Sequence, residues 1–450
     1  MSADSATQKK EETPKAMNRW IVVIGGILIQ LALGAIYAWS AFTTPLQGAA
    51  GSLSEFAFSK TETQAIFSAG LLTFAIFTII GGRLRNKYGS MKVALSGGVL
   101  LGLGYILASF VGASFVGKLA CIGIVAGAGI GLAYVVPIAV GVSWFPDKKG
   151  LVSGLAVAGF GFGAFIWILL ANPPSILGFS GLITRQTGAY AYTVLNVDNA
   201  FRLYGIVFLI LVGVGSLVMK NPPKGWKPAG WNPPVLDSTR KKASYSCGPR
   251  EMCTRKEFYL LWMMFIIGAL AGLMVIGNVQ NFAKSPTDGF TLAKGFTPTQ
   301  AADYAVIGAA VCLPIFNGAG RIVWGQVSDK IGRKKAFLSM FLFQGIMMAV
   351  FFYTTTYPIA FYVAAALIGF NFGGNFALFP AACADSFGAE NLGLNYGFIF
   401  TAYGIGGTVG PILAGAVQDA GLSFLYAFVP SAVMCFIAAA LAFAYKDPCD

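Results

Sequence analysis

Twelve long apolar stretches dominate this chain of 450 residues. An α-helix that crosses the hydrocarbon core of a bilayer needs about 20 mostly apolar residues, because each residue rises about 1.5 Å and the core is about 30 Å thick. Only 11% of the residues are charged, less than half of the roughly 25% that is typical of a soluble protein. We therefore predict an all-α membrane protein with twelve transmembrane helices, at residues 19–45, 62–83, 91–112, 116–143, 150–172, 201–220, 257–281, 302–325, 335–354, 358–384, 394–417 and 422–445.

The basic residues are unevenly distributed between the two sides of these spans. An even number of spans places both termini on one side, and 24 of the 31 Lys and Arg residues fall on that side. Such an excess marks the cytoplasmic side of a membrane protein. We predict a multi-pass protein of the cell (inner) membrane with both termini cytoplasmic, residues 1–18 forming a disordered tail. The net charge of +13 thus orients the chain and does not indicate binding to nucleic acid.

The chain repeats itself at a fixed offset of 243 residues. The segment GRLRNKYG (82–89) aligns with GQVSDKIG (325–332), and Pro137 aligns with Pro380. Four glycines that follow this proline share the offset. Duplicated six-helix halves are typical of secondary transporters, in which the halves rock about a central site. The predicted division is an N-terminal bundle at 19–220, a central cytoplasmic loop at 221–256 and a C-terminal bundle at 257–446.

Both copies of the repeated segment resemble the loop signature of the major facilitator superfamily, which lies between spans 2 and 3 and between spans 8 and 9. Asn86 stands where that family usually has Asp, so the charged contact of this loop is expected only at Asp329. The residues that carry the motif are Gly82, Asn86 and Gly89 in the first copy and Gly325, Asp329, Gly332 and Arg333 in the second.

Five further segments resemble the oxalate/formate antiporter family within that superfamily. They are IYAWSAF (36–42), SWFPDKKGLVSG (143–154), NGAGRIVWG (317–325), FALFPAACADSFG (376–388) and NYGFIF (395–400). The resemblance implies the twelve-helix fold of two six-helix halves. It also implies transport of oxalate and formate, or of lactate and similar monocarboxylates.

Arg321 is the one ionisable residue that we place well inside a span. A guanidinium matches a carboxylate through two parallel hydrogen bonds, and a buried cation needs an anion. The interiors of the spans offer no acidic residue, so the substrate would supply that anion. Because Arg321 lies about four residues from the cytoplasmic end of its span, an alternative is that it extends to the lipid headgroups. The resemblance favours substrate binding, since the family's carboxylate-binding arginine occupies this position, and Asn317 one turn earlier would add a hydrogen bond.

The family's oxalate exchangers have a second cation in span 11, and Tyr403 stands in its place. One cation suits a monoanion, because a second carboxylate would lie uncompensated in a low dielectric. We therefore expect a monocarboxylate such as lactate, pyruvate, formate, acetate or glycolate. Aromatic side chains are expected to line the site, with packing in the core as the alternative for each. They are Tyr37, Trp39, Tyr134, Phe160, Phe372, Phe376, Phe400 and Tyr403, with Asn371 and Asn375 as further polar candidates.

Energy coupling is the least constrained feature. The chain has no GxxxxGK[ST] motif, so we predict a secondary transporter and not an enzyme or a nucleotide-driven pump. It also has no histidine, so a coupled proton needs a carboxylate or travels with the substrate. Asp303 is the candidate proton-coupling group, at the outer end of the helix that carries Arg321 and on the same face; solvation of the helix mouth is its alternative role.

Three functions remain open from the sequence. They are a proton-coupled or exchanging monocarboxylate transporter, an oxalate:formate antiporter, and a carboxylate sensor that has lost transport. The expected partners are a small monocarboxylate anion, a proton or counter-anion, and the lipid bilayer. No nucleic acid, metal or cofactor is expected, and the chain is expected to be a monomer.

Overall fold

Among the residues that the structure describes, twelve helical stretches are long and apolar enough to cross a membrane, which confirms the predicted number and the helical fold class. The computed structural model describes residues 17–48, 56–147, 149–177, 181–187, 191–194, 197–223, 226–228, 247–388 and 391–445. Nine stretches centre on one helix each: α3 (Lys60–Tyr88), α4 (Ser90–Ala108), α7 (Lys149–Ala171), α8 (Val197–Leu217), α10 (Lys256–Ala283), α13 (Arg333–Phe351), α14 (Pro358–Phe387), α15 (Leu392–Asp419) and α16 (Leu425–Ala444). A 3-10 turn, η7 (Phe352–Thr356), continues α13.

The other three stretches change helix type along their length. The first passes through a 3-10 segment, and the other two each contain a π-helical segment, a feature that often accompanies functional sites. Their parts are α1 (Arg19–Leu33), η1 (Gly34–Ala38) and α2 (Ser40–Leu46); α5 (Phe115–Lys118), η2 (Leu119–Ala126) and α6 (Gly127–Trp144); and α11 (Pro298–Ile307), η6 (Gly308–Cys312) and α12 (Leu313–Ile331).

Several helices extend beyond the predicted apolar spans because their ends are set by local capping residues. Ser59 and Thr297 each form a capping box with the third residue of the helix that follows, which fixes the starts of α3 and α11. Gly89 and Gly332 end α3 and α12 at φ 90° and 86°, a conformation that favours glycine. The apolar pattern shows the membrane-crossing part, whereas these residues determine the helix length.

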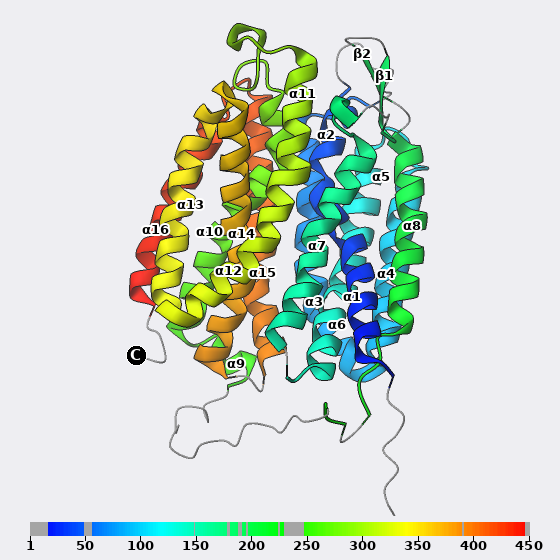
Figure 1. Ribbon diagram of the computed structural model, residues 1–450, viewed down its shortest axis with the longest axis vertical. Coiled ribbons are helices and arrows are strands. Elements are labelled where there is room, and N and C mark those ends of the chain that lie inside the picture. The colour runs from blue at the N-terminus through cyan, green and yellow to red at the C-terminus, as the bar shows by residue number, and fades with distance from the viewer. Residues whose placement is uncertain are drawn as a thin grey trace, which may run out of the picture.

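The helices form two six-span bundles that stand side by side (Figure 1). Spans from α1 to α8 make the first half, and spans from α10 to α16 make the second. Across the boundary α3 packs along α15, and α7 packs against α12. Close approach of helices depends on small residues, as at Gly97 of α4, where a Cβ would lie 2.7 Å from the carbonyl oxygen of Gly129.

The start of α1 and the end of α16 lie at the same end of the molecule, here named the terminal end (Figure 1). The short helix α9 (Pro249–Met252) also lies there. The predicted tail lies mostly, and the central loop in large part, outside the described residues. The opposite end is named the distal end.

The distal end contains small elements that the sequence analysis did not predict. A hairpin of β1 (Thr184–Thr187) and β2 (Ala191–Val194) joins α7 to α8, with Thr184 opposite Val194 in antiparallel register. Two short helical turns, η3 (Ser175–Leu177) and η5 (Leu292–Lys294), lie in the loops after α7 and α10. These segments are too short and too polar to stand out in an apolar pattern.

Candidate functional site

Arg321 of α12 lies buried between the two halves, with 7% of its surface exposed. Its Nε donates to Oδ1 of Asn317 at 2.9 Å, one turn earlier on the same helix. Its Nη1 donates to the main-chain oxygen of Val157 in α7 at 3.1 Å, which ties the arginine to the opposite half. The ring of Phe376 lies 4.3 Å from the guanidinium carbon, a cation–π contact that also shields the charge from water. The arginine therefore lies in the interface and not at the lipid surface.

The guanidinium of Arg321 has N–H groups beyond those used in these two hydrogen bonds. An arginine has five N–H groups, and these two hydrogen bonds use one on Nε and one on Nη1. Among the described residues, none of the ion pairs includes Arg321. A buried charge without a partner is costly, so this position is suited to an anion that comes from outside the protein.

Asn317 has a defined orientation because arginine can donate hydrogen bonds but cannot accept them. Its Oδ1 faces Arg321, so its Nδ2 must point elsewhere. Asn317 also lines a small cavity between the halves. The lining residues are Tyr37, Gly161, Ala164, Ile276, Ala309, Leu313, Pro314 and Asn317.

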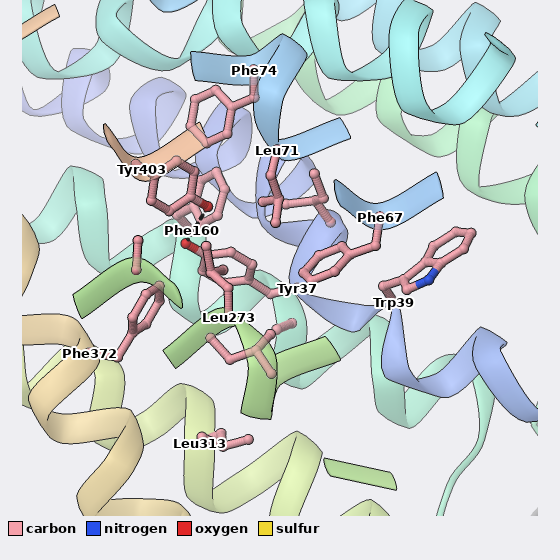
Figure 2. Close-up of a cluster of buried hydrophobic side chains, with 14 of the residues drawn as sticks. Tyr37, Trp39, Phe67, Leu71, Phe74, Phe160, Leu273, Leu313, Phe372 and Tyr403 are labelled. Carbon is pink, nitrogen blue, oxygen red and sulfur yellow. Dashed lines mark hydrogen bonds between the residues drawn. The ribbon is translucent and has the colours of Figure 1, made fainter. Parts of the chain in front are cut away.

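Tyr37, which also lines this cavity, joins the halves through Tyr403, with their hydroxyl oxygens 2.8 Å apart (Figure 2). Both side chains are almost fully buried. Phe160 and Phe372 pack on Tyr37 with ring centroids 4.9 and 5.9 Å away. The structure thus brings Tyr37 and Tyr403 together, but each hydroxyl is engaged by the other.

A second layer of rings surrounds this pair. Tyr403 stacks on Phe400 at 4.8 Å, and Phe400 stacks on Tyr134 at 5.9 Å. Phe74 of α3, which the sequence analysis missed, contacts this layer at 5.0 Å from Tyr134 and 5.6 Å from Tyr403. The repeat offset was a usable signal, because adding 243 to position 74 gives 317.

Trp39 lies apart from this group. Its Nε1 donates to the main-chain oxygen of Thr63 at 2.8 Å, and it lines a separate apolar cavity inside the first half together with Phe67 and Tyr105. Figure 2 shows Trp39 beside Phe67, away from the Tyr37–Tyr403 pair. The structure therefore does not bring Trp39 to the cavity that Arg321 and Asn317 approach.

Asn371 and Asn375 contact residues of the second half. The Oδ1 atom of Asn371 accepts from Nε1 of Trp324 at 3.1 Å, and Nδ2 of Asn375 donates to the main-chain oxygen of Phe372. The Asn371 contact joins α14 to α12 within the second half, whereas the Asn375 contact stays within α14.

Asp303 lies at the distal end, where its carboxylate accepts hydrogen bonds from the main-chain nitrogen of Ser175 at 2.6 Å and from the Ser175 hydroxyl. The helix between Asp303 and Arg321 is interrupted by the π-helical η6. The expectation that both residues share one face of a continuous α-helix is therefore not met.

Lys118 is a second buried base, which the sequence analysis did not single out. It lies at the end of α5 with its side chain fully buried. Its ammonium group donates to Asp198 in the first turn of α8 and to the main-chain oxygen of Ala108. Because α8 begins at Val197, earlier than predicted, Asp198 lies in its first turn, where Lys118 is its basic partner.

The sequence matches the family model of the Major Facilitator Superfamily over residues 22–313 and 286–448. The chain belongs to the major facilitator superfamily. It is 28% identical over 437 residues to the oxalate:formate antiporter of Oxalobacter formigenes, covering 97% of this chain and 93% of that protein. It is also 28% identical over 469 residues to the apicoplast pyruvate carrier 1 of Toxoplasma gondii, covering 89% and 83%.

Solved structures agree on the architecture. The nucleoside transporter NupG superposes with a TM-score of 0.65 at 13% identity, covering 95% of this chain and 100% of that chain. This likeness shows the fold alone. Together with the sequence relatives it makes the chain a membrane transporter and not an enzyme, and the antiporter match confirms the resemblance to the oxalate/formate family.

The two superfamily loop motifs lie at the terminal end, between α3 and α4 and between α12 and α13. In the second copy Arg333 donates to Asp329 at 2.7 Å and to Asp385 of α14 at 2.8 Å. In the first copy Asn86 accepts from Nη2 of Arg85 at 3.3 Å. Gly82 and Gly325 lie within α3 and α12, before the last turn of each helix.

Proposed function

We propose that this protein is a secondary transporter of small monocarboxylates that works by alternating access, either coupled to protons or by exchange. The observation that carries the proposal is the buried guanidinium of Arg321, which lies between the halves with unused donors and without an acidic partner among the described residues. A carboxylate substrate supplies the missing charge through two parallel hydrogen bonds. The similarity to a pyruvate carrier and to an oxalate:formate antiporter supports this substrate class.

The residues around Arg321 fit a substrate with a single negative charge. Tyr403 occupies the position of the second family cation and uses its hydroxyl in the hydrogen bond with Tyr37. The cavity next to Asn317 is mainly apolar, with Ile276, Ala309 and Leu313 in its wall. A dianion would leave one carboxylate uncompensated there, whereas a short carbon chain packs against these side chains. Lactate, pyruvate, formate, acetate and glycolate meet these conditions.

Alternating access requires one end to be closed while the other opens. Among the described residues, the hydrogen bonds that join the halves lie from mid-membrane towards the distal end, at Tyr37–Tyr403, Arg321–Val157, Ser68–Thr408, Gln64–Gly277, Thr43–Asn281, Ser175–Asp303 and Lys60–Asp419. This conformation is closed distally. With the basic excess on the terminal side, we infer that the termini are cytoplasmic and that the distal end faces outward.

The test is uptake of labelled lactate and pyruvate into proteoliposomes, with and without a pH gradient. Arg321→Lys keeps the charge but loses the planar fork, and we expect uptake to fall about tenfold or more. Arg202→Lys is the matched control, because Arg202 contacts Ser109 and Phe110 at the rim of the first half and lies outside the site. Equal uptake by Arg321→Lys and Arg202→Lys would overturn the proposal.

An oxalate:formate exchange is the second candidate, favoured by the 28% identity to that antiporter over nearly the whole chain. It predicts that vesicles loaded with oxalate take up formate by counterflow. If lactate exchanges against lactate but loading the vesicles with oxalate drives no uptake, the result would favour the monocarboxylate function.

A further inference from the structure

Helix α3 begins at the distal end with main-chain donors that its own half leaves unpaired. The first N–H groups of a helix lack intrahelical acceptors and form its positive end. Ser59 caps only the amide of Glu62, and the Glu62 carboxylate returns to the amide of Ser59. The amides of Lys60 and Thr61 instead donate to the two oxygens of Asp419, at 2.9 and 2.7 Å. Asp419 ends α15 and belongs to the other half.

The surrounding backbone is shaped for this contact. A Cβ on Gly415 of α15 would lie 2.9 Å from the Cα of Thr61 and 3.0 Å from the main-chain oxygen of Lys60. Only glycine therefore permits this approach of α15 to the start of α3. The side chain of Lys60 adds a hydrogen bond to Gln418 at 3.3 Å.

A second acidic residue makes the same kind of contact between α11 and the segment after α7. Asp303 of the second half binds the main-chain nitrogen and the hydroxyl of Ser175 in the first half. The helix that bears Asp303 is separated from the Arg321 helix by η6 and Pro314. A π-helical segment followed by proline weakens the hydrogen-bond ladder of a helix, so α11 can move at its distal end while α12 keeps Arg321 in place.

We propose that Asp419 and Asp303 are positioning residues that form the distal gate of the transporter. Each carboxylate of the second half holds main-chain N–H groups of the first half, and both contacts must break before the cavity at Asn317 opens to the distal side. This proposal depends on the alternating access proposed above, but it does not depend on which anion the protein carries.

The first experiment measures access to the cavity without any substrate. Ile276, a lining residue, is changed to cysteine, and a membrane-impermeant maleimide is applied from the distal side. Labelling is quantified at that position by peptide mass spectrometry, so the native cysteines remain. We expect Asp419→Ala and Asp303→Ala each to raise the labelling rate about tenfold, the shift that loss of a charge-assisted hydrogen bond allows.

Glu62→Ala is the matched control, because Glu62 is an acidic residue at the same helix start whose contact stays within the first half. It should leave labelling unchanged. Asp419→Asn keeps one accepting oxygen and should give an intermediate rate, and size-exclusion chromatography checks that each variant is folded. An unchanged rate in the folded Asp419→Ala/Asp303→Ala double variant would overturn the gate. Because no substrate is present, this result is independent of whether Arg321 binds a monocarboxylate.

A crosslink tests the same gate in the opposite direction. In Ser175→Cys/Asp303→Cys, a short bis-methanethiosulfonate joins the two thiols through disulfide bonds, with sulfinate as the leaving group, and would hold the distal end closed. Uptake should fall at least tenfold on crosslinking and return on reduction with dithiothreitol. Full uptake by the crosslinked protein would show that this contact does not need to open.

Discussion

Asn317 and Arg321 of the second half correspond, at the 243-residue offset, to Phe74 and Thr78 of the first half. Phe74 and Thr78 lie in the second span of the first half, and Asn317 and Arg321 lie in the second span of the second half. Only Asn317 and Arg321 offer charge and free hydrogen-bond donors. The Thr78 hydroxyl bonds back to the main chain of Phe74 at 2.9 Å, and the Phe74 ring joins the aromatic layer around Tyr134. At these two equivalent positions the second half thus supplies polar contacts, whereas the first half supplies a ring and a hydroxyl that is already bonded.

The loops at the terminal end differ in the same way. Gly89 and Gly332 share nearly the same backbone conformation, with φ and ψ of 90° and 156° in the first and 86° and 157° in the second. Arg333 is held by Asp329 and Asp385. The corresponding residues of the first half are Ser90, Asn86 and Val142. After duplication the turn must keep its glycine, whereas charges can be lost from one copy because the halves do not need equal chemistry.

Removing the polar contact from each half should give the largest difference. Arg321→Ala should lower lactate uptake about a hundredfold or more, since it removes the charge that compensates a buried carboxylate. Thr78→Val, at the equivalent position, should lower it no more than about twofold, because its hydroxyl only contacts its own helix. Initial uptake rates in proteoliposomes measure both. Comparable losses in the two variants would mean that the division between the halves is not functional.

Adding a base to the second half should change the substrate class. In Tyr403→Lys the ammonium group enters the aromatic layer near Arg321, so a second carboxylate gains a partner. We expect oxalate uptake to rise about tenfold relative to lactate uptake. Tyr403→Phe serves as the control, because it removes only the hydrogen bond with Tyr37. If both variants show the same ratio of oxalate to lactate uptake, charge at this position does not select the substrate.

Sequence reasoning found those features that depend on side-chain type and apolar length. The twelve spans follow from such patterns, whereas the pattern left Arg321 open between a buried site and the lipid headgroups, and the family resemblance favoured the buried site. The carbonyl oxygen of Val157, which ties Arg321 to the first half, has no sequence signal because every residue carries one. For the same reason the donors of Lys60 and Thr61 at the distal gate could not be foreseen.

Helix phase explains the misplaced aromatic residue and the misjudged helix face. Tyr37 and Trp39 are two residues apart, about 200° around an α-helix, so they cannot both face one site; the 3-10 segment η1 shifts their phase further. For Asp303, the π-helical η6 adds residues to a turn and rotates the helix before Arg321. Apolar composition carries no information about these changes of helix type.

Breaking the charged contacts of the second loop should have a smaller effect than either change at the site. Arg333→Gln loses its bonds to Asp329 and Asp385, which are 69% and 30% exposed, and should cost about 1 kcal/mol of unfolding free energy. Ser90→Ala at the equivalent position should cost less than about 0.5 kcal/mol. Thermal unfolding in detergent compares the two. Because salt screens exposed charges, the Arg333→Gln difference should shrink in high salt, and a difference that grows with salt would contradict this account.

The smallest expected effect concerns Lys284, which follows α10 at the distal end and has Ala41 as its equivalent in the first half. Its Nζ donates to Oε1 of Gln280 at 3.0 Å, and burial lowers the pKa of Lys284 to about 8. Between this value and the ordinary lysine pKa near 10.5, the unfolded chain holds a proton that the folded protein has released. The free energy of unfolding should therefore rise with pH over this window, and Lys284 should add no pH dependence below it. Lys284→Met should remove that rise, so that its melting temperature changes less between pH 8 and 10 than that of the unmodified protein. Identical pH profiles for the two proteins would mean that burial does not desolvate Lys284, and that the second half gains no pH dependence from it.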